Sequence, residues 1–203
     1  FSAGADLNWM RRAANFSEEE NTADAHQLAA MLRTLDEFPC PTLALVNGAA
    51  FGGGIGLVAA CDIAIASTQA QFSLSEVRLG LVPATISPYV VAAIGQRAAR
   101  RFYLTGERFD ANTAHSIDLV HEVVPHDELK AAGEKMIDTL LSGGPKAQAV
   151  AKNLIKETAP ARDRDYLDAW TARLIAEIRQ TDEAAEGLAA FFDKRPAAWQ
   201  TQR

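Results

Sequence analysis

The sequence predicts an α/β protein with a helical C-terminal region. Strand-like apolar runs alternate with helix-like segments up to about residue 125, whereas residues 126–203 show helical patterns only. The third observation is a run of glycines, Gly52–Gly54, placed between the apolar run Thr42–Val46 and an apolar, alanine-rich segment. Such a run is typical of a strand that turns sharply into a helix. We therefore expect a core of residues 1–125 and a helical region of residues 126–203.

The first segments are short and polar. Asp6 is expected to cap a helix that continues to Met10, and the charged residues from Arg11 to Asn21 are expected to form a mobile surface segment. A second helix is expected to begin at Thr22 or Asp24. Its apolar stripe follows helical spacing and consists of Ala25, Leu28, Met31, Leu32 and Leu35.

The remaining core elements follow from apolar runs and from the residues that break them. Extended segments are expected at Thr42–Val46, Asp62–Ala66, Gln71–Ser73 and Leu119–Val124. Helices are expected at Ser87–Ile94, Gln96–Leu104 and Asn112–His115, with Gly95 separating the first two. The helical region is expected to contain Glu128–Leu141, Ala147–Glu157, Tyr166–Gln180 and Glu183–Phe192.

Composition excludes several classes of function. The chain has 203 residues, 48% of them hydrophobic, and a net charge of −6, which argues against general binding to nucleic acid or to a membrane surface. No apolar run is long enough to span a bilayer. The four histidines show no ligand spacing with cysteines or paired carboxylates, so no metal site is expected. Cys40 and Cys61 lie in apolar settings, as expected for free thiols in the cytoplasm.

The glycine turn is a candidate anion site. Glycines let a ligand approach the backbone closely, and the first N–H groups of the following helix have no internal partners. The positive end of the helix dipole favours a phosphate, a carboxylate or an oxyanion that develops during a reaction. No Lys-Ser or Lys-Thr follows the glycines, which excludes a Walker phosphate loop. The alternative is a tight turn that only packs a helix on a sheet.

Glu76 is the candidate proton shuttle. Its sequence neighbours include the apolar residues Leu74, Val77 and Leu79, and a carboxyl group in apolar surroundings has a raised pKa. A glutamate of that kind exchanges protons near neutral pH. The alternative is an exposed glutamate that pairs with Arg78.

Several motifs, in a specific order along the whole chain, resemble those of the crotonase superfamily of enoyl-CoA hydratases and isomerases. Two resemble the oxyanion-loop motifs of that family, and a third resembles the segment that carries its catalytic glutamate. A fourth resembles its C-terminal signature. These motifs are Phe1–Leu7, Ala50–Gly54, Ala70–Phe72 with Glu76, Gly80 and Pro83, and finally Glu186-Gly187, Ala190-Phe191 and Lys194–Pro196.

The resemblance implies roles for particular residues. The N–H groups of Ala3 and Gly53 would form an oxyanion hole for a thioester carbonyl, and Glu76 would be the acid and base. Substrate and CoA contacts would come from Ala3, Gly4, Ala5, Asp6, Leu7, Gly52, Gly53, Gly56, Arg78, Ala84 and Lys194. For Asp6, the alternative is a role in capping alone. CoA would enter as part of the substrate, and no other cofactor is implied.

The resemblance also implies an architecture. The fold would be a spiral of ββα turns followed by C-terminal helices that form a homotrimer or a hexamer. Lys194 would act from a neighbouring subunit. Because the chain begins at Phe1, within a motif, we expect that an N-terminal part is missing.

The chain departs from the family pattern at one catalytic position. Gly56 stands where typical hydratases carry the first of two glutamates, and Ala84–Ser87 replaces a glycine-rich run. A single glutamate is typical of Δ3,Δ2-enoyl-CoA isomerases of the family. However, the segment Leu74–Pro88 with Arg97–Arg101 resembles bacterial 3-methylglutaconyl-CoA hydratases of leucine degradation.

These observations leave three functions open. The leading one is hydration of a 2-enoyl-CoA, with 3-methylglutaconyl-CoA as the expected substrate. Our hypothesis for that substrate is that its distal carboxylate lies near the space above Gly56 and orients water, with Arg78 or another base nearby. The alternatives are an enoyl-CoA isomerase and a non-catalytic interaction protein.

Overall fold

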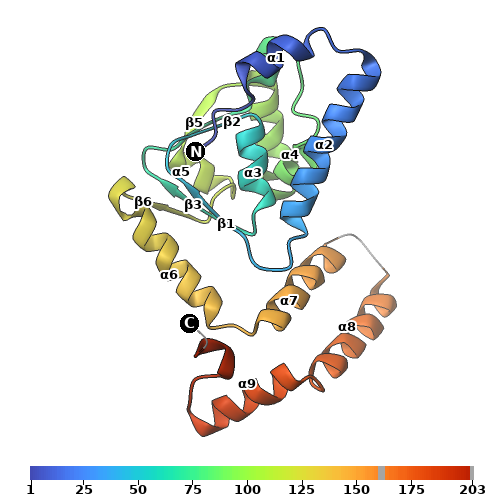
Figure 1. Cartoon of the computed structure of the whole chain (residues 1–203), viewed down its shortest axis with the longest axis vertical. Helices are drawn as coiled ribbons and strands as arrows, with labels where there is room; N and C mark the ends of the chain where they lie inside the picture. Colours follow the sequence, from blue (N-terminus) through green and yellow to red (C-terminus); the bar gives the residue numbers. More distant parts are fainter. Residues whose placement is uncertain (160–162, 202–203) are drawn as a thin grey trace. The chain divides into compact units, whose positions relative to one another are not determined.

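The computed structural model describes residues 1–159 and 163–201 (Figure 1). The chain forms two compact units. The first consists of Phe1–Phe38 and Thr42–Glu134, and the second consists of Pro39–Pro41 and Lys135–Arg203. The division at residues 125 and 126 that the sequence suggests stays a prediction about domains.

The strands of the first unit form, within the described residues, two three-stranded sheets with the orders β1-β3-β6 and β2-β4-β5. All neighbouring strands are parallel except β4 and β5, which are antiparallel. The alternation of strands and helices in the sequence predicted an α/β core, and the structure has one. The bounds are β1 Leu43–Val46, β2 Ala49–Phe51, β3 Ile63–Ser67, β4 Gln71–Ser73, β5 Arg108–Asp110 and β6 Glu122–Val124.

Parallel neighbours need a crossover, and the one that leads from β1 to its neighbour β3 contains β2 and helix α3, Gly53–Ala60. The helix is strongly apolar and is buried at Ile55 and Val58. Asp62 closes the crossover, since its carboxylate accepts hydrogen bonds from the N–H and the hydroxyl of Thr42 at 2.7 and 2.8 Å. The start of β1 is thereby tied to the start of β3.

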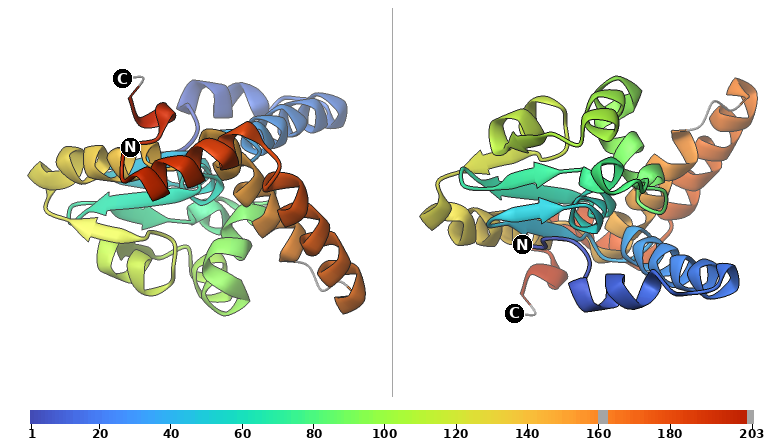
Figure 2. Two further views of the ribbon diagram at one scale, coloured as in Figure 1. Left: turned by 90° about the horizontal axis from the view of Figure 1, so that it is seen from below. Right: turned by 90° about the horizontal axis from the view of Figure 1, so that it is seen from above.

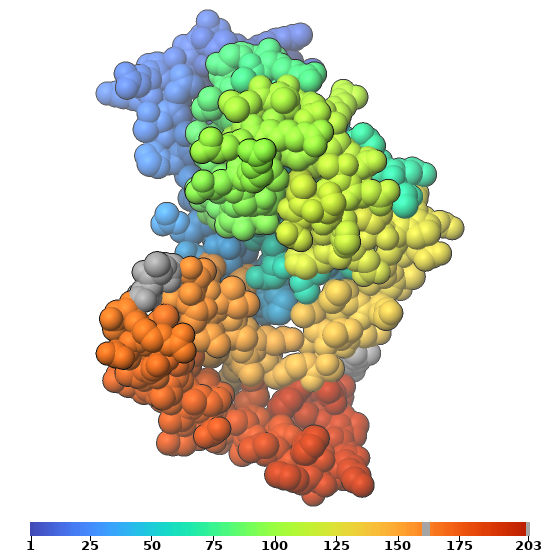
Figure 3. Space-filling model, turned by 180° about the vertical axis from the view of Figure 1, so that it is seen from behind, coloured from blue at the N-terminus to red at the C-terminus, as the bar shows by residue number. Residues whose placement is uncertain are grey.

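The helices of the first unit lie on two sides of its strands, with α4 and α5 on one side and α1 and α2 on the other (Figure 2). Seen from behind, α4 and α5 cover much of one face of this unit (Figure 3). Helix α3 packs against both α2 and α4. The bounds are α1 Leu7–Ala13, α2 Glu18–Asp36, η1 Ser75–Leu79, α4 Ser87–Thr105, α5 Ala111–Ser116 and η2 His126–Glu128, followed by the start of α6, Leu129–Leu141.

The core of the first unit is built around three aromatic rings. Phe72 of β4 stacks on Phe109 of β5 with ring centroids 5.5 Å apart, and Phe102 of α4 contacts Phe109 at 4.2 Å. Burial of such rings contributes on the order of 2–3 kcal/mol each. This cluster fixes α4 against the sheet that contains β2 and β4.

The expectation of a mobile segment from Arg11 to Asn21 is wrong. Helix α1 continues to Ala13, and α2 begins at Glu18, before Thr22 or Asp24. Ser17 and Glu20 form a capping box, with the Ser17 hydroxyl accepting from the Glu20 N–H at 3.2 Å and the Glu20 carboxylate accepting from the Ser17 N–H at 2.8 Å. The segment was interpreted as mobile because it is charged, but the Ser17 and Glu20 pair within it specifies the start of α2.

The break expected at Gly95 is confirmed. Helix α4 contains one residue with non-helical dihedral angles, Gly95, at φ 69° and ψ 163°. This region of conformational space is accessible essentially to glycine alone. The short strands β2 and β5 were not expected from the sequence, because three residues are too few to show alternation.

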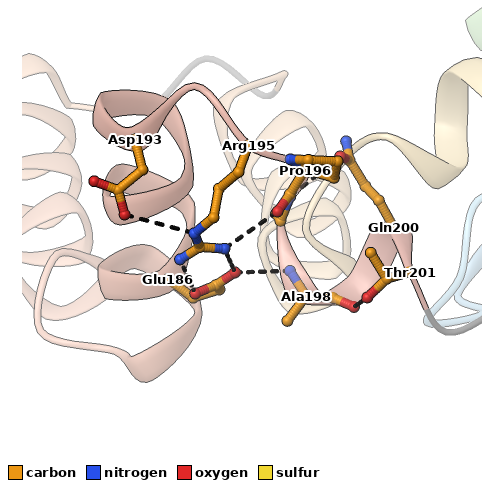
Figure 4. Close-up of polar contacts among 8 residues, drawn as sticks. Glu186, Asp193, Arg195, Pro196, Ala198, Gln200 and Thr201 are labelled. Carbon is orange, nitrogen blue, oxygen red and sulfur yellow. Dashed lines mark hydrogen bonds and ion pairs between the residues drawn. The ribbon is translucent and has the colours of Figure 1, made fainter.

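The second unit is helical, as the sequence indicates. It contains the rest of α6, then α7 Pro145–Thr158, α8 Arg164–Ile178, α9 Asp182–Asp193 and the short η3 Ala198–Gln200. The segment that follows α9 is held by Arg195, whose guanidinium binds both oxygens of Glu186 at 2.7 and 2.9 Å (Figure 4). Glu186 also accepts from the N–H of Ala198 at 2.7 Å. The C-terminal motif is therefore a clamp between α9 and η3.

The described residues contain no helix whose length and apolar character would let it cross a bilayer. Among the same residues, no group of three histidine, cysteine or acidic side chains is arranged to hold a metal ion.

Candidate functional site

The site begins where the N-terminal segment joins the edge of β2. The N–H of Ser2 donates to the carbonyl of Ala49 at 2.8 Å, and the N–H of Phe51 donates to the carbonyl of Ser2 at 2.9 Å. Ser2 thereby extends the sheet as an isolated parallel bridge with Ala50. The next residues, Ala3 and Gly4, leave the sheet beside the glycine turn.

Gly54 makes this approach possible. A methyl group at position 54 would lie 2.5 Å from the carbonyl oxygen of Ser2, closer than real contacts allow. The two segments that carry the predicted oxyanion donors, Ala3 and Gly53, are therefore in contact one residue away from each donor. That both N–H groups reach a single oxygen atom stays a prediction.

The start of α3 presents unpaired donors. Gly52 precedes the helix at φ 50° and ψ −118°, and its N–H donates to the carbonyl of Ser73 at 2.9 Å. The N–H of Gly53 is the first of the helix and has no acceptor within it. A methyl group at position 53 would meet no atom within 4 Å, so the space in front of Gly53 is open to a ligand.

Glu76 lies directly against this turn. It belongs to η1, and a methyl group at position 52 would be 3.0 Å from its Oε1 atom, so Gly52 allows the carboxyl group to come close. Its other oxygen, Oε2, is buried and has no hydrogen-bond partner among the described residues. Burial raises the pKa of Glu76 above its ordinary value of 4.5, and a backbone interaction lowers it in part. A carboxyl group of raised pKa without a partner is suited to proton transfer.

The cause of this burial differs from the sequence expectation. Of the apolar residues near Glu76 in sequence, Leu74 is buried, but Val77, Leu79, Leu81 and Val82 are exposed. The half-buried state of Glu76 comes from the glycine turn and from α4, which packs against η1. Tertiary contacts, rather than sequence neighbours, set its environment. The alternative of an ion pair with Arg78 is not observed within the described residues.

Gly56 does not border an open space, contrary to our hypothesis. A methyl group at position 56 would overlap with Cγ2 of Ile86 and would lie 2.8 Å from its Cβ. Ile86, with 2% of its surface exposed, therefore fills the position where typical hydratases carry the first glutamate. The substrate's distal carboxylate has no room above Gly56, and that part of the hypothesis is wrong.

Arg78 is held elsewhere. Its Nε donates to the carbonyl of Thr105 at 3.4 Å, and its side chain covers Gly106, where a methyl group would be 3.1 Å from Nε. The guanidinium thus lies at the C-terminal end of α4, whereas Gly56 contacts Ile86. The expectation of Arg78 beside Gly56 is not supported by these contacts.

The other predicted contact residues are placed as follows. Residues 3–7 are all exposed, and the carboxylate of Asp6 accepts from the N–H of Trp9 at 2.7 Å, which confirms its capping role. Ala84 is exposed in the turn before α4. Lys194 belongs to the second unit, where it ends α9 with φ 53°. Contacts of these residues with CoA stay predictions.

Two residues were missed by sequence reasoning. Ile86 could have been found, because it lies in the segment Ala84–Ser87, where the chain departs from the family pattern as it does at Gly56. Tyr103 gave no local signal, since it stands in a basic helix. Its buried hydroxyl oxygen has no hydrogen-bond partner among the described residues.

Comparison with known proteins decides the family. The family described as enoyl-CoA hydratase/isomerase matches residues 1–202. The chain belongs to this family. The crotonase resemblance and its fold are thus confirmed, and the chain is grouped with the enoyl-CoA hydratases, which are enzymes.

Individual relatives agree with this assignment. A crystal structure of an enoyl-CoA hydratase from Shewanella pealeana is 51% identical, with a TM-score of 0.94, and the match covers 98% of this chain and 74% of that one. The short-chain-enoyl-CoA hydratase of Clostridium acetobutylicum is 30% identical over 96% of this chain and 74% of its own length. A mitochondrial Δ(3,5)-Δ(2,4)-dienoyl-CoA isomerase of Dictyostelium discoideum is also 30% identical, over 88% of this chain and 63% of its own length.

Proposed function

We propose that this protein adds water across the 2,3 double bond of a 2-enoyl-CoA thioester, with Glu76 as the single acid and base. The observation that carries the proposal is the buried, unpartnered Oε2 of a carboxyl group that lies against the glycine turn before α3. A family of enoyl-CoA hydratases and isomerases supplies the reaction class.

We propose the following chemistry for these groups. The thioester oxygen accepts hydrogen bonds from the N–H groups of Ala3 and Gly53, which stabilise the negative charge of an enolate; each such donor contributes on the order of 10²–10³ in rate. Glu76 takes a proton from water as the oxygen attacks C3, and then gives a proton to C2. One carboxyl group thereby completes both proton transfers.

We further propose 3-methylglutaconyl-CoA as the substrate, in leucine degradation in the cytoplasm. The support is the resemblance of the Leu74–Pro88 segment to hydratases that act on this thioester.

The experiment that tests the proposal is an assay of purified protein with crotonyl-CoA, 3-methylglutaconyl-CoA and a 3-enoyl-CoA. Hydration removes the absorbance of the conjugated thioester, and we expect the greatest kcat/KM with 3-methylglutaconyl-CoA. Gain of absorbance from the 3-enoyl substrate alone would instead establish the isomerase. The filled position at Gly56 favours this second candidate, because a single carboxyl group is sufficient to move a proton from C2 to C4.

A non-catalytic role is the third candidate. The substitution Glu76→Gln distinguishes this role from the two enzymatic ones. If the protein is not catalytic, the variant will leave every CoA-dependent activity unchanged. We expect instead a loss of about 10²–10⁴ in kcat, the usual contribution of a positioned acid or base.

We also propose that the second unit assembles the protein into a trimer or a hexamer. Phe191 and Phe192 of α9 are 76% and 73% exposed, which is unusual for adjacent aromatic residues of a monomer. Light scattering on the full chain and on a Phe191→Ser/Phe192→Ser variant tests this. A monomeric wild type would contradict it.

A further inference from the structure

Hydratases with two glutamates hold the attacking water with both, and this chain has only one. The position of the other is filled by the apolar side chain of Ile86. An inference about how water is held therefore rests on the proposed hydratase function. The group that replaces the lost carboxylate must be polar, buried and close to Glu76.

Only two buried side-chain oxygens in the described residues have no hydrogen-bond partner: Oε2 of Glu76 and the hydroxyl oxygen of Tyr103. Buried polar atoms without partners are rare in folded proteins, and each calls for an explanation. The two atoms come from adjacent elements, because η1, which carries Glu76, packs against α4, which carries Tyr103.

The break at Gly95 places Tyr103 at this site. In an uninterrupted helix, Ser87 and Tyr103 would be separated by about 24 Å along the axis. The non-helical angles of Gly95 fold the second half of α4 back, so that Ser87 lies near enough to Tyr103 to influence its pKa. The Ser87 hydroxyl donates its own proton to the carbonyl of Pro83 at 2.7 Å. The Tyr103 hydroxyl oxygen has no hydrogen-bond partner among the described residues.

Tyr103 remains a neutral hydroxyl at physiological pH. Burial raises the pKa of Tyr103 above its ordinary value of 10.0, nearby Ser87 lowers it in part, and the negative charge of Glu76 raises it further. The end of α4 that carries Tyr103 also contacts η1 directly, since the Nε of Arg78, two residues after Glu76, donates to the carbonyl of Thr105 at 3.4 Å. A neutral phenol both donates and accepts hydrogen bonds without adding a second charge.

We propose that the Tyr103 hydroxyl takes the place of the missing glutamate and holds, together with Glu76, the water that is added to the double bond. One O–H of the water donates to Oε2 of Glu76 and the other donates to the oxygen of Tyr103. The free lone pair of the water then faces C3 of the substrate.

The step balances with these two groups. A lone pair of the water forms the C3–O bond, the π pair of the double bond moves to the enolate oxygen, and one proton of the water passes to Glu76. Glu76 then returns a proton to C2, which gives the 3-hydroxyacyl thioester. Tyr103 gains and loses nothing, so it is a positioning residue for the nucleophile.

The test is Tyr103→Phe in the full chain, which removes only the hydroxyl. We expect kcat for hydration of both crotonyl-CoA and 3-methylglutaconyl-CoA to fall about tenfold to 100-fold, as for other groups that position a reacting proton. KM, the melting temperature and the pH at which activity is lost on the acid side should stay unchanged. Tyr166→Phe, at an exposed ring of the second unit, is the matched control and should retain the wild-type kcat.

Each other outcome overturns the inference. A Tyr103→Phe hydratase with wild-type kcat would show that the hydroxyl does not hold the water. A rise in KM confined to 3-methylglutaconyl-CoA would assign the hydroxyl to the substrate's distal carboxylate. A fall in kcat together with a lower melting temperature and a change in the pH at which activity is lost on the acid side would indicate a structural role. A wild-type chain that hydrates neither thioester would overturn the proposed function itself, and this inference with it.

Discussion

At the scale of single residues, the site depends on two glycines. Each lacks a side chain and so leaves room for the side chain of a neighbouring residue. Gly52 allows the Glu76 carboxyl group to approach the turn, and Gly56 allows Ile86 to fill the position of a second acid. The same residue type therefore has opposite effects on the polarity of the site. One glycine admits a carboxylate, and the other admits an apolar side chain.

The raised pKa of Glu76 predicts how activity depends on pH. Glu76 must be ionised to accept a proton from water, and burial places its pKa above 4.5. We expect kcat/KM to fall on the acid side with a midpoint above pH 4.5. A pH-rate profile of the wild-type chain measures this. A midpoint at or below the ordinary value would show that Glu76 is solvated like a surface carboxylate or is not the base.

The same pKa shift predicts an effect on stability. A carboxyl group whose pKa is raised by folding is most favourable when protonated, so stability is fully present below the ordinary pKa of 4.5 and is lost as pH rises through the folded pKa. Glu76→Gln should therefore melt at a slightly higher temperature than the wild type at neutral pH. The difference should vanish in acid. Calorimetry at both pH values checks the sign, and a less stable variant at neutral pH would contradict it.

The contact between Gly56 and Ile86 predicts coupled substitutions. Gly56→Ala alone should destabilise the chain by about 1–3 kcal/mol through overpacking. Ile86→Ala alone should cost about 2–5 kcal/mol because it leaves a cavity. The double variant should be more stable than the sum of the two costs implies. Chemical denaturation of the four proteins gives the coupling energy, and strict additivity would show that the residues do not touch.

At the scale of elements, α4 joins three parts of the site. The helix begins directly after Ile86, and its direction changes at Gly95. Its last turns carry Tyr103 and the carbonyl of Thr105, which accepts a hydrogen bond from Arg78. The sequence predicted the break, and the structure confirms it. The consequence of the break, a phenol near Glu76, depends on the angle between the two halves.

Gly95→Ala tests this dependence. The dihedral angles at Gly95 are accessible essentially to glycine, so the variant should lose about 1–3 kcal/mol of stability. No atom lies within 4 Å of an added methyl group, so the cost comes from the backbone rather than from crowding. The activity of the variant should also fall, because the two halves of α4 shift relative to each other. Gln96→Ala, at an exposed neighbouring position, is the control and should change neither quantity.

At the scale of the whole molecule, the chain forms two compact units. The first has a mixed core of strands and helices, and the second is held at its end by the clamp of Glu186 and Arg195. Hydrogen bonds from Arg195, with a further one from the Ala198 N–H, lower the pKa of Glu186 to about 2. The clamp therefore responds to acid.

The clamp predicts acid sensitivity in the second unit. Because folding lowers the pKa of Glu186 from 4.5 to about 2, its stabilising effect is present above pH 4.5 and is lost as pH falls toward about 2. Glu186→Gln should lower the melting temperature at neutral pH and flatten the acid dependence. Asp193→Asn, which removes only a 3.5 Å contact with Arg195, should have the smaller effect. Equal melting curves for Glu186→Gln and the wild type would contradict a stabilising role.

Local patterns in the sequence predicted the α/β core, the glycine turn, the break at Gly95 and the choice of Glu76, but not β2, β5 or the start of α2. These features depend on residues close together in the chain, where spacing and turn chemistry are directly visible. The two family motifs around Ala3 and Gly53 also gave the reaction class.

Only the tertiary structure decided which groups lie around the glycine turn, helix α3 and Glu76. Ser2 joins β2 across many residues, Ile86 fills the space at Gly56, and Tyr103 comes close because α4 folds back. Neighbouring apolar residues in the sequence suggested the right pKa direction for a partly wrong reason, since most of them are exposed. Contacts between distant residues depend on where each element packs, and periodicity along the chain carries no information about that.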